Sequence, residues 1–129
     1  MKFKIKIYYA DTDCGGVVYY ARYLEYFERA RTEWFESKNL SVKKLPEDDI
    51  LFIVKSAAIE YNAPAKYGDT IEVDIEAQKI SGVSIDFSYT ITNAKDSRLL
   101  VTGKTRVVSI NKDMRPVRIP RDIMKKIKS

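Results

Sequence analysis

The sequence predicts an α+β fold in which an antiparallel five-stranded sheet wraps around one long central helix. Three observations predict it: a short alternating segment at the N-terminus, a segment with apolar residues at helical spacing, and four later strand-like segments. A lone amphipathic helix needs a sheet to cover its apolar side. A chain of 129 residues can bury a substantial core, so we expect one domain spanning residues 1–129.

The first two elements differ in the period of their apolar residues. In residues 2–8, Phe3, Ile5 and Ile7 alternate with lysines, as in a half-buried strand. Residues 20–38 instead repeat every three or four positions, which predicts a helix of about five turns. The residues expected on its inner face are Tyr20, Tyr23, Leu24, Phe27, Ala30, Arg31 and Trp34.

The rest of the chain alternates between turns and strands. Residues 41–49 are polar and contain a proline, which predicts a connecting loop with a short helical turn. Alternation and β-branched residues predict four strands, and turn residues between them favour antiparallel hairpins. The predicted strands cover residues 50–60, 70–80, 83–92 and 99–110, and a short helix begins at Pro120.

Composition limits the chemistry that this chain can perform. The sequence has no histidine, which excludes Ser-His and Cys-His catalysis and histidine-bearing zinc sites. No apolar run approaches the roughly 20 residues that cross a bilayer, and the single cysteine, Cys14, agrees with a reducing compartment. We therefore expect a cytoplasmic protein without a membrane span. The basic residues behind the net charge of +5 are scattered among acids, which favours a solvated surface or a phosphate-bearing ligand over nucleic acid.

The most unusual local feature is the run Asp11-Thr12-Asp13-Cys14-Gly15-Gly16. As a calcium loop it would place glycine at the fifth position and Arg22 at the twelfth, where a glutamate is required, so no metal site is predicted. Asp11 is compatible with a structural role as a cap or Asx-turn. No histidine is present to activate Cys14, so we expect it to be a small loop residue rather than a nucleophile.

Taken together with the helix that follows, the run can form a site for an oxyanion. Two glycines allow close approach of a ligand to the backbone, and N–H groups at a helix N-terminus attract negative charge. A carboxylate beside such a site can act as general base or nucleophile. Because a thiol leaves readily as thiolate without a strong proton donor, this equipment is compatible with thioester hydrolysis.

The run DTDCGGVVYYARYL, residues 11–24, followed by FERARTE, residues 27–33, resembles the 4-hydroxybenzoyl-CoA thioesterase family, which includes Tol-Pal-associated acyl-CoA thioesterases and has the hotdog fold. Residues 61–65, YNAPA, and Gly68-Asp69 are also similar. The resemblance implies that Asp13 is the catalytic carboxylate and that the Tyr20 backbone N–H polarises the carbonyl, with Gly16 allowing close approach. Many relatives carry histidine at the position of Tyr20, but a backbone donor does not depend on the side chain.

The same resemblance implies an acyl-CoA thioesterase, and we expect it to need no cofactor. The predicted sheet leaves one face and an open edge for a partner subunit, so we expect a homodimer, or a dimer of dimers. Tyr19 and Tyr23 are candidates to line the acyl pocket, although aromatic residues on such a helix also fit a core or interface. Lys79 and Ser81 are candidates for contact with the phosphates of CoA. Two alternatives stay open: a thioesterase for acyl carrier protein, and a non-catalytic acyl-binding or interaction module.

Overall fold

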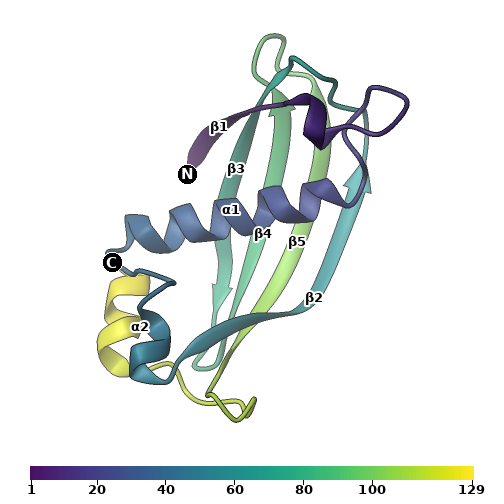
Figure 1. The fold of residues 1–129 in the computed structure, drawn as a ribbon. Helices are drawn as coiled ribbons and strands as arrows, with labels where there is room; N and C mark the ends of the chain where they lie inside the picture. The colour runs from purple at the N-terminus through teal and green to yellow at the C-terminus, as the bar shows by residue number, and fades with distance from the viewer.

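The five predicted strands form a single antiparallel sheet, in the order β1-β3-β4-β5-β2. The computed structural model describes all of residues 1–129 (Figure 1). Its elements are β1 (Lys2–Lys6), the 3-10 turn η1 (Tyr9–Asp11), α1 (Arg22–Ser37), the 3-10 turn η2 (Leu45–Asp48), β2 (Leu51–Tyr61), β3 (Thr70–Ile80), β4 (Ser84–Asn93), β5 (Leu99–Ile110) and α2 (Arg121–Ile127). The predicted hotdog architecture is confirmed.

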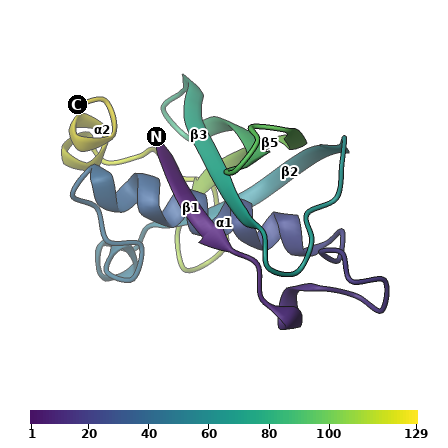
Figure 2. The ribbon, with the colours of Figure 1, turned by 90° about the horizontal axis from the view of Figure 1, so that it is seen from above.

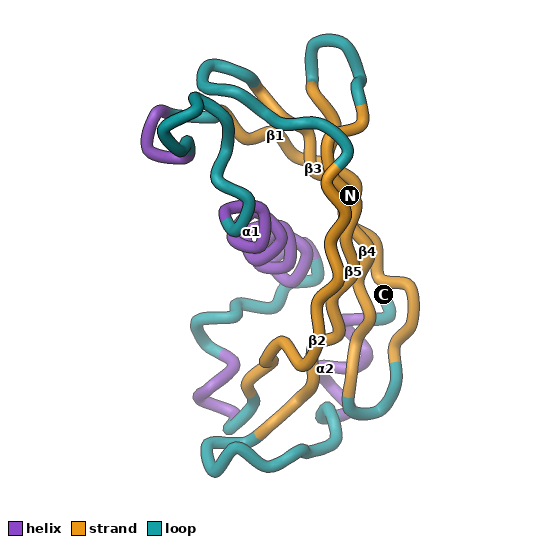
Figure 3. The backbone as a smooth tube through the Cα atoms, turned by 90° about the vertical axis from the view of Figure 1, so that its right-hand side faces the viewer, coloured by secondary structure: helices purple, strands orange, loops and turns teal.

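Helix α1 lies across one face of the curved sheet, whereas the opposite face is uncovered (Figures 2 and 3). The ring of Phe27 on α1 stacks on the ring of Tyr89 on β4, with ring centroids 4.1 Å apart. Directly beside this ring, β5 has Gly103, where a β-carbon would overlap the Phe27 side chain. The absence of a side chain at Gly103 thus allows α1 to lie close to β5.

The helix is shorter than the sequence predicts. It has 16 residues, or about four and a half turns, and is not unusually long. Tyr20 and Ala21 precede its first residue, and the chain leaves it at Lys38 and Asn39, where φ of Asn39 reaches 60°. A left-handed residue of this kind ends a helix.

The inner face of α1 is also rotated from the predicted one. The buried residues are Tyr23, Tyr26, Phe27, Ala30, Trp34 and Phe35. Tyr20 and Leu24, which were predicted to face inward, are 62% and 42% exposed. Tyr20 lies outside the helix and does not follow its period, and Leu24 occupies the side of the first turn that faces away from the sheet.

Strand boundaries agree with the prediction within one residue, except in β1. That strand ends at Lys6 because the backbone N–H of Tyr8 donates to the Asp11 carboxylate, at 2.9 Å, and a 3-10 turn begins. The predicted helical turn in residues 41–49 is present as η2, and the predicted C-terminal helix is present as α2. None of the helices combines the length and the apolar character needed to cross a bilayer.

Candidate functional site

The Asp-Gly run folds into a small hairpin between β1 and α1. Thr12 pairs with Val18, the Asp13 N–H donates to the Val17 carbonyl at 2.9 Å, and the Gly16 N–H donates to the Asp13 carbonyl at 3.1 Å. Gly16 has a φ of +78°, a conformation that glycine adopts without steric cost. The two glycines therefore serve the turn that presents Asp13.

This hairpin is fixed to the segment between β2 and β3. The Val18 N–H donates to the Ala65 carbonyl at 2.9 Å, and the Tyr67 N–H donates to the Gly16 carbonyl at 3.3 Å. These backbone bonds at Gly16 and Val18 limit the freedom of the loop. The position of Asp13 is thus set by the strand-connecting segment as well as by its own turn.

The two aspartates of the run differ in accessibility. Asp11 is only 9% exposed, accepts the Tyr8 N–H, and has Oδ1 3.6 Å from Nε of Arg22. Arg22 also donates to the Ala10 carbonyl at 3.1 Å. Asp11 and Arg22 thus tie the loop to the start of α1, which is the structural role allowed for Asp11.

Asp13 is exposed and its carboxylate has a single partner in the chain. Its Oδ1 accepts the N–H of Gly15 at 2.8 Å, and Oδ2 accepts no hydrogen bond. No ion pair engages it. Asp13 is therefore the accessible carboxylate of the pair.

A cavity of about 320 Å³ opens beside Asp13. Its lining joins the Asp13 loop, the start of α1 and the end of β2. The lining residues are Asp13, Val17, Val18, Tyr20, Tyr23, Tyr61, Asn62, Ala63 and Pro64. Most of these side chains are apolar or aromatic, with few polar groups, as is usual for sites that bind small organic groups.

Tyrosines organise the wall of this cavity. The Tyr61 hydroxyl donates to the Tyr20 carbonyl at 3.0 Å, and the Ala65 N–H donates to the Tyr23 hydroxyl at 3.2 Å. Burial raises the pKa of both Tyr23 and Tyr61, so both phenols are neutral near pH 7. The bond from Tyr61 holds the Tyr20 segment in place.

The Tyr20 backbone N–H makes no hydrogen bond within the chain. Tyr20 precedes α1 by two residues. A free N–H beside a helix N-terminus is a donor for a developing oxyanion. The sequence hypothesis put the donor at the helix start; Tyr20 lies just before the N-cap residue, Ala21.

The remaining predicted site residues are distributed unevenly. Tyr23 lines the cavity, whereas Tyr19 is 46% exposed, lies outside the lining and packs its ring on Tyr20 at 4.7 Å. Lys79 and Ser81 lie near the far end of β3, roughly 30 Å along the strand from Thr70. Because β3 begins at the end of the sheet where the Asp13 loop is bonded to residues 65–69, the chain does not bring Lys79 and Ser81 to Asp13.

Sequence reasoning did not assign Tyr61, Asn62 or Pro64 to the site. The signal that could have identified them is the run YNAPA, residues 61–65, which carries part of the family resemblance. Residues 61–64 of this run line the same cavity as Asp13.

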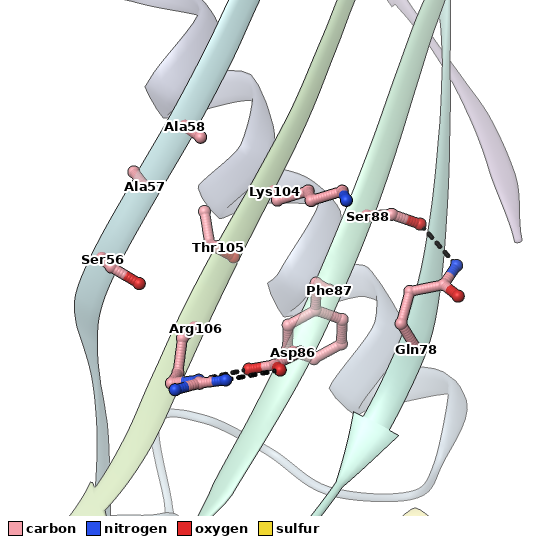
Figure 4. A pocket seen from close by; sticks show the side chains of 10 residues that line it. All are labelled: Ser56, Ala57, Ala58, Gln78, Asp86, Phe87, Ser88, Lys104, Thr105 and Arg106. Carbon is pink, nitrogen blue, oxygen red and sulfur yellow. Dashed lines mark hydrogen bonds and ion pairs between the residues drawn. The ribbon is translucent and has the colours of Figure 1, made fainter.

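A second, larger groove of about 690 Å³ runs over strands β2 to β5 (Figure 4). Phe87 of β4 packs on Trp34 of α1, so its neighbours Asp86 and Ser88 point to the uncovered face. Asp86 accepts two bonds from Arg106, at 2.7 and 3.0 Å. The Arg106 guanidinium lowers the pKa of Asp86, and this pairing leaves no free carboxylate in the groove. The cavity at Asp13 is the better catalytic candidate.

Metal-binding side chains and the Cys14 thiol are the further candidates for chemistry. No group of three or more Cys, Asp and Glu side chains is close enough to hold a metal ion. Cys14 is exposed and unpaired beside Asp13. Its thiol makes no hydrogen bond to an activating base, in agreement with the expectation of a loop residue.

Comparison with known proteins gives relatives over nearly the full chain. The chain is 39% identical to the acyl-CoA thioesterase YbgC of Haemophilus influenzae, over 94% of this chain and 89% of that protein. It is 35% identical to the acyl-CoA thioester hydrolase YbgC of Escherichia coli, over 98% and 95%. A 1,4-dihydroxy-2-naphthoyl-CoA thioesterase structure from Synechocystis superposes with a TM-score of 0.90 at 27% identity, covering 99% and 95%. The family model of the thioesterase-like superfamily matches residues 8–127, so this chain belongs to the thioesterase-like superfamily.

Proposed function

We propose that the protein is an acyl-CoA thioesterase that hydrolyses the thioester to a free acid and CoA. The observation that carries the proposal is that an accessible carboxylate, Asp13, lines one cavity together with Tyr20, whose backbone N–H makes no hydrogen bond in the chain. The names of the relatives, two acyl-CoA thioesterases and one aromatic acyl-CoA thioesterase, support the same substrate class.

In the proposed reaction the acyl carbonyl oxygen accepts the Tyr20 N–H. As the carbonyl carbon becomes tetrahedral, negative charge grows on that oxygen, and the positive end of α1 stabilises it. Asp13 either removes a proton from the attacking water or attacks the carbon itself to form an anhydride, which water then hydrolyses. In both routes the thiolate of CoA is expelled and the acyl group leaves as a carboxylate.

The oligomer is part of the proposal. Strand β2 is an edge strand that pairs only with β5, and its Leu51, Val54 and Tyr61 are 36%, 45% and 48% exposed. A long, partly apolar edge strand is a template for pairing with another chain. Since Tyr61 also lines the cavity, a second copy on β2 would border the site. We therefore propose a homodimer through β2, with a dimer of dimers as the larger assembly and the cytoplasm as the expected location.

Thiol release from acyl-CoAs of short, long and aromatic acyl groups tests the chemistry. Asp13→Asn keeps the size of the side chain but removes the base and nucleophile, so kcat should fall by at least about a hundredfold. Asp96→Asn is the matched control, because Asp96 Oδ1 accepts the N–H two residues later, at 2.9 Å, as Asp13 does, but in the turn between β4 and β5, outside the cavity lining. The control should keep full activity.

The same assay separates the alternatives. Equal activity of Asp13→Asn and the parent protein would overturn the assignment of Asp13. Binding of acyl-CoA without release of thiol would favour a non-catalytic acyl-binding module. Hydrolysis of acyl groups on acyl carrier protein at a much higher kcat/KM than on CoA would make the carrier protein the substrate.

A further inference from the structure

The excess positive charge of this protein is confined to one end of the molecule. Residues 38–49 and 111–129 carry ten Lys and Arg against five Asp and Glu, whereas the rest of the chain has thirteen of each. We call these two segments, which contain η2 and α2, the basic end (Figure 1). Its cations are Lys38, Lys43, Lys44, Lys112, Arg115, Arg118, Arg121, Lys125, Lys126 and Lys128.

None of the cations of the basic end forms an ion pair with an Asp or Glu side chain. Every ion pair between side chains of this protein lies elsewhere, on α1 and in strands β1 to β5. Nine of the ten cations are exposed, and the tenth, Lys38, is half-buried. A surface with unpaired charge of one sign attracts partners of the opposite sign.

Contacts between the segments make the basic end one continuous surface. Nζ of Lys38 donates to the Ser129 carbonyl at 2.6 Å, and Nζ of Lys126 donates to the Asn39 carbonyl at 3.4 Å. The Lys112 N–H donates to the Asp49 carboxylate at 2.8 Å. Helix α2 is held on the core by Ile123 and Ile127, which are 3% and 1% exposed. The lysines of α2 are therefore held in a fixed position on the core.

The basic end also exposes two isolated apolar side chains. Met114, at the tip of the turn between β5 and α2, is 66% exposed and has a φ of 63°. Val42, in the loop before η2, is 39% exposed. An apolar side chain surrounded by cations is suited to the boundary between lipid headgroups and acyl chains, where both find favourable partners.

We propose that the basic end docks this protein on the surface of an anionic lipid bilayer. The cations are spread over several segments, and Met114 and Val42 are the only large apolar side chains of the basic end that are exposed. An interface with an acidic protein would instead need a packed apolar centre. Each lysine or arginine close to an anionic bilayer strengthens binding roughly fivefold, so several together give measurable affinity. The Asp13 loop is at the opposite end of the sheet (Figure 1), so docking leaves its cavity open.

Vesicle flotation of the full chain tests the proposal. Vesicles of phosphatidylcholine with about one-third phosphatidylglycerol should bind the protein, and vesicles of phosphatidylcholine alone should not. Reversal of two charges at the end of α2, Lys125→Glu with Lys128→Glu, should lower the partition coefficient at least about tenfold. The matched control is Lys95→Glu with Arg98→Glu, which makes the same charge change in the exposed turn between β4 and β5.

The outcomes are distinct. Retained vesicle binding by the control, together with loss in the α2 variant, supports docking through the basic end. Equal loss in both variants would mean that net charge alone drives binding and would overturn the proposal. The proposal would also be overturned if the protein bound poly-glutamate through the lysines of α2 but floated with neither kind of vesicle. That result would indicate that the basic end binds an acidic protein. Thioester hydrolysis in solution serves as the folding control for both variants.

Discussion

Asp11 and Asp13 are separated by one residue but differ in burial, and this difference separates their roles. Asp11 is enclosed and shares its carboxylate between the Tyr8 N–H and the side chain of Arg22. Asp13 has one short bond to Gly15 and otherwise faces the cavity and solvent. A carboxylate that reacts must give up its hydrogen bonds. Reaction at an aspartate with several structural bonds would therefore destabilise the fold, whereas a carboxylate with one bond can exchange that bond for one to substrate or water.

Tyr20 provides a residue-scale prediction about a backbone donor. Tyr20→Ala keeps the N–H and removes only the ring, so kcat should fall by less than about tenfold, far less than in Asp13→Asn. The ring lines the cavity, so KM should rise for substrates whose acyl group contacts it. Steady-state kinetics of thiol release measure both constants.

Tyr67→Ala is the control for that variant, because Tyr67 is equally exposed, at 63%, and lies outside the cavity. It should leave kcat and KM unchanged. A loss in Tyr20→Ala as large as that in Asp13→Asn would show that the phenol, rather than the backbone, acts on the substrate.

Single residues also mark where sequence reasoning stops. The Asp-x-Asp-x-Gly-Gly run located the loop, but nothing in its spacing tells which carboxylate is buried. That difference depends on Arg22, eleven positions beyond Asp11, whose guanidinium reaches back to the loop. Tyr61 was not assigned to the site for the same reason, because its hydroxyl meets Tyr20 from a strand 41 positions away.

At the scale of elements, the contact between α1 and β5 depends on one missing side chain. Gly103→Ala would drive a β-carbon into the Phe27 ring, and both groups are enclosed by rigid neighbours. The helix would have to move away from the sheet or the ring would have to leave its stack on Tyr89. We expect a loss of about 2–3 kcal/mol in the free energy of unfolding, measured by urea denaturation.

Gly82→Ala is the matched control for this substitution. Its β-carbon would meet the guanidinium of Arg118 at 3.2 Å, and the end of a flexible exposed side chain can shift at little cost. Its stability should stay within about 0.5 kcal/mol of the parent protein. Equal losses in both variants would show that glycine in general, and not the packing of Phe27, determines the effect.

Periodicity predicted the elements well because each strand and helix contains its own signal. Strands β3 and β5 match their predicted ranges, since their alternation continues to the last paired residue. The orientation of α1 was less predictable. Phe35 is buried against Phe52 and Phe87 of two strands, and such partners do not appear in the periodicity of the helix itself.

At the scale of the whole molecule, strand order has the greatest functional consequence. Chain order alone does not place β2 at the edge beyond β5, because β3 and β4 intervene in the sequence but not in that pair. The observed order leaves one edge of eleven residues open beside the cavity.

The open edge leads to a prediction about assembly. Val54 of β2 is 45% exposed, and in the proposed homodimer it is covered by the second copy. Val54→Glu would bury a carboxylate without a partner at that interface, which should weaken the dimer at least about tenfold. Sedimentation velocity over a range of protein concentrations measures the change, and Val83→Glu is the control, since Val83 is 40% exposed in the turn before β4. A parent protein that sediments as a monomer at micromolar concentration would contradict the proposed dimer. A monomeric Val54→Glu protein with full activity would show instead that the cavity beside Asp13 is complete in one chain.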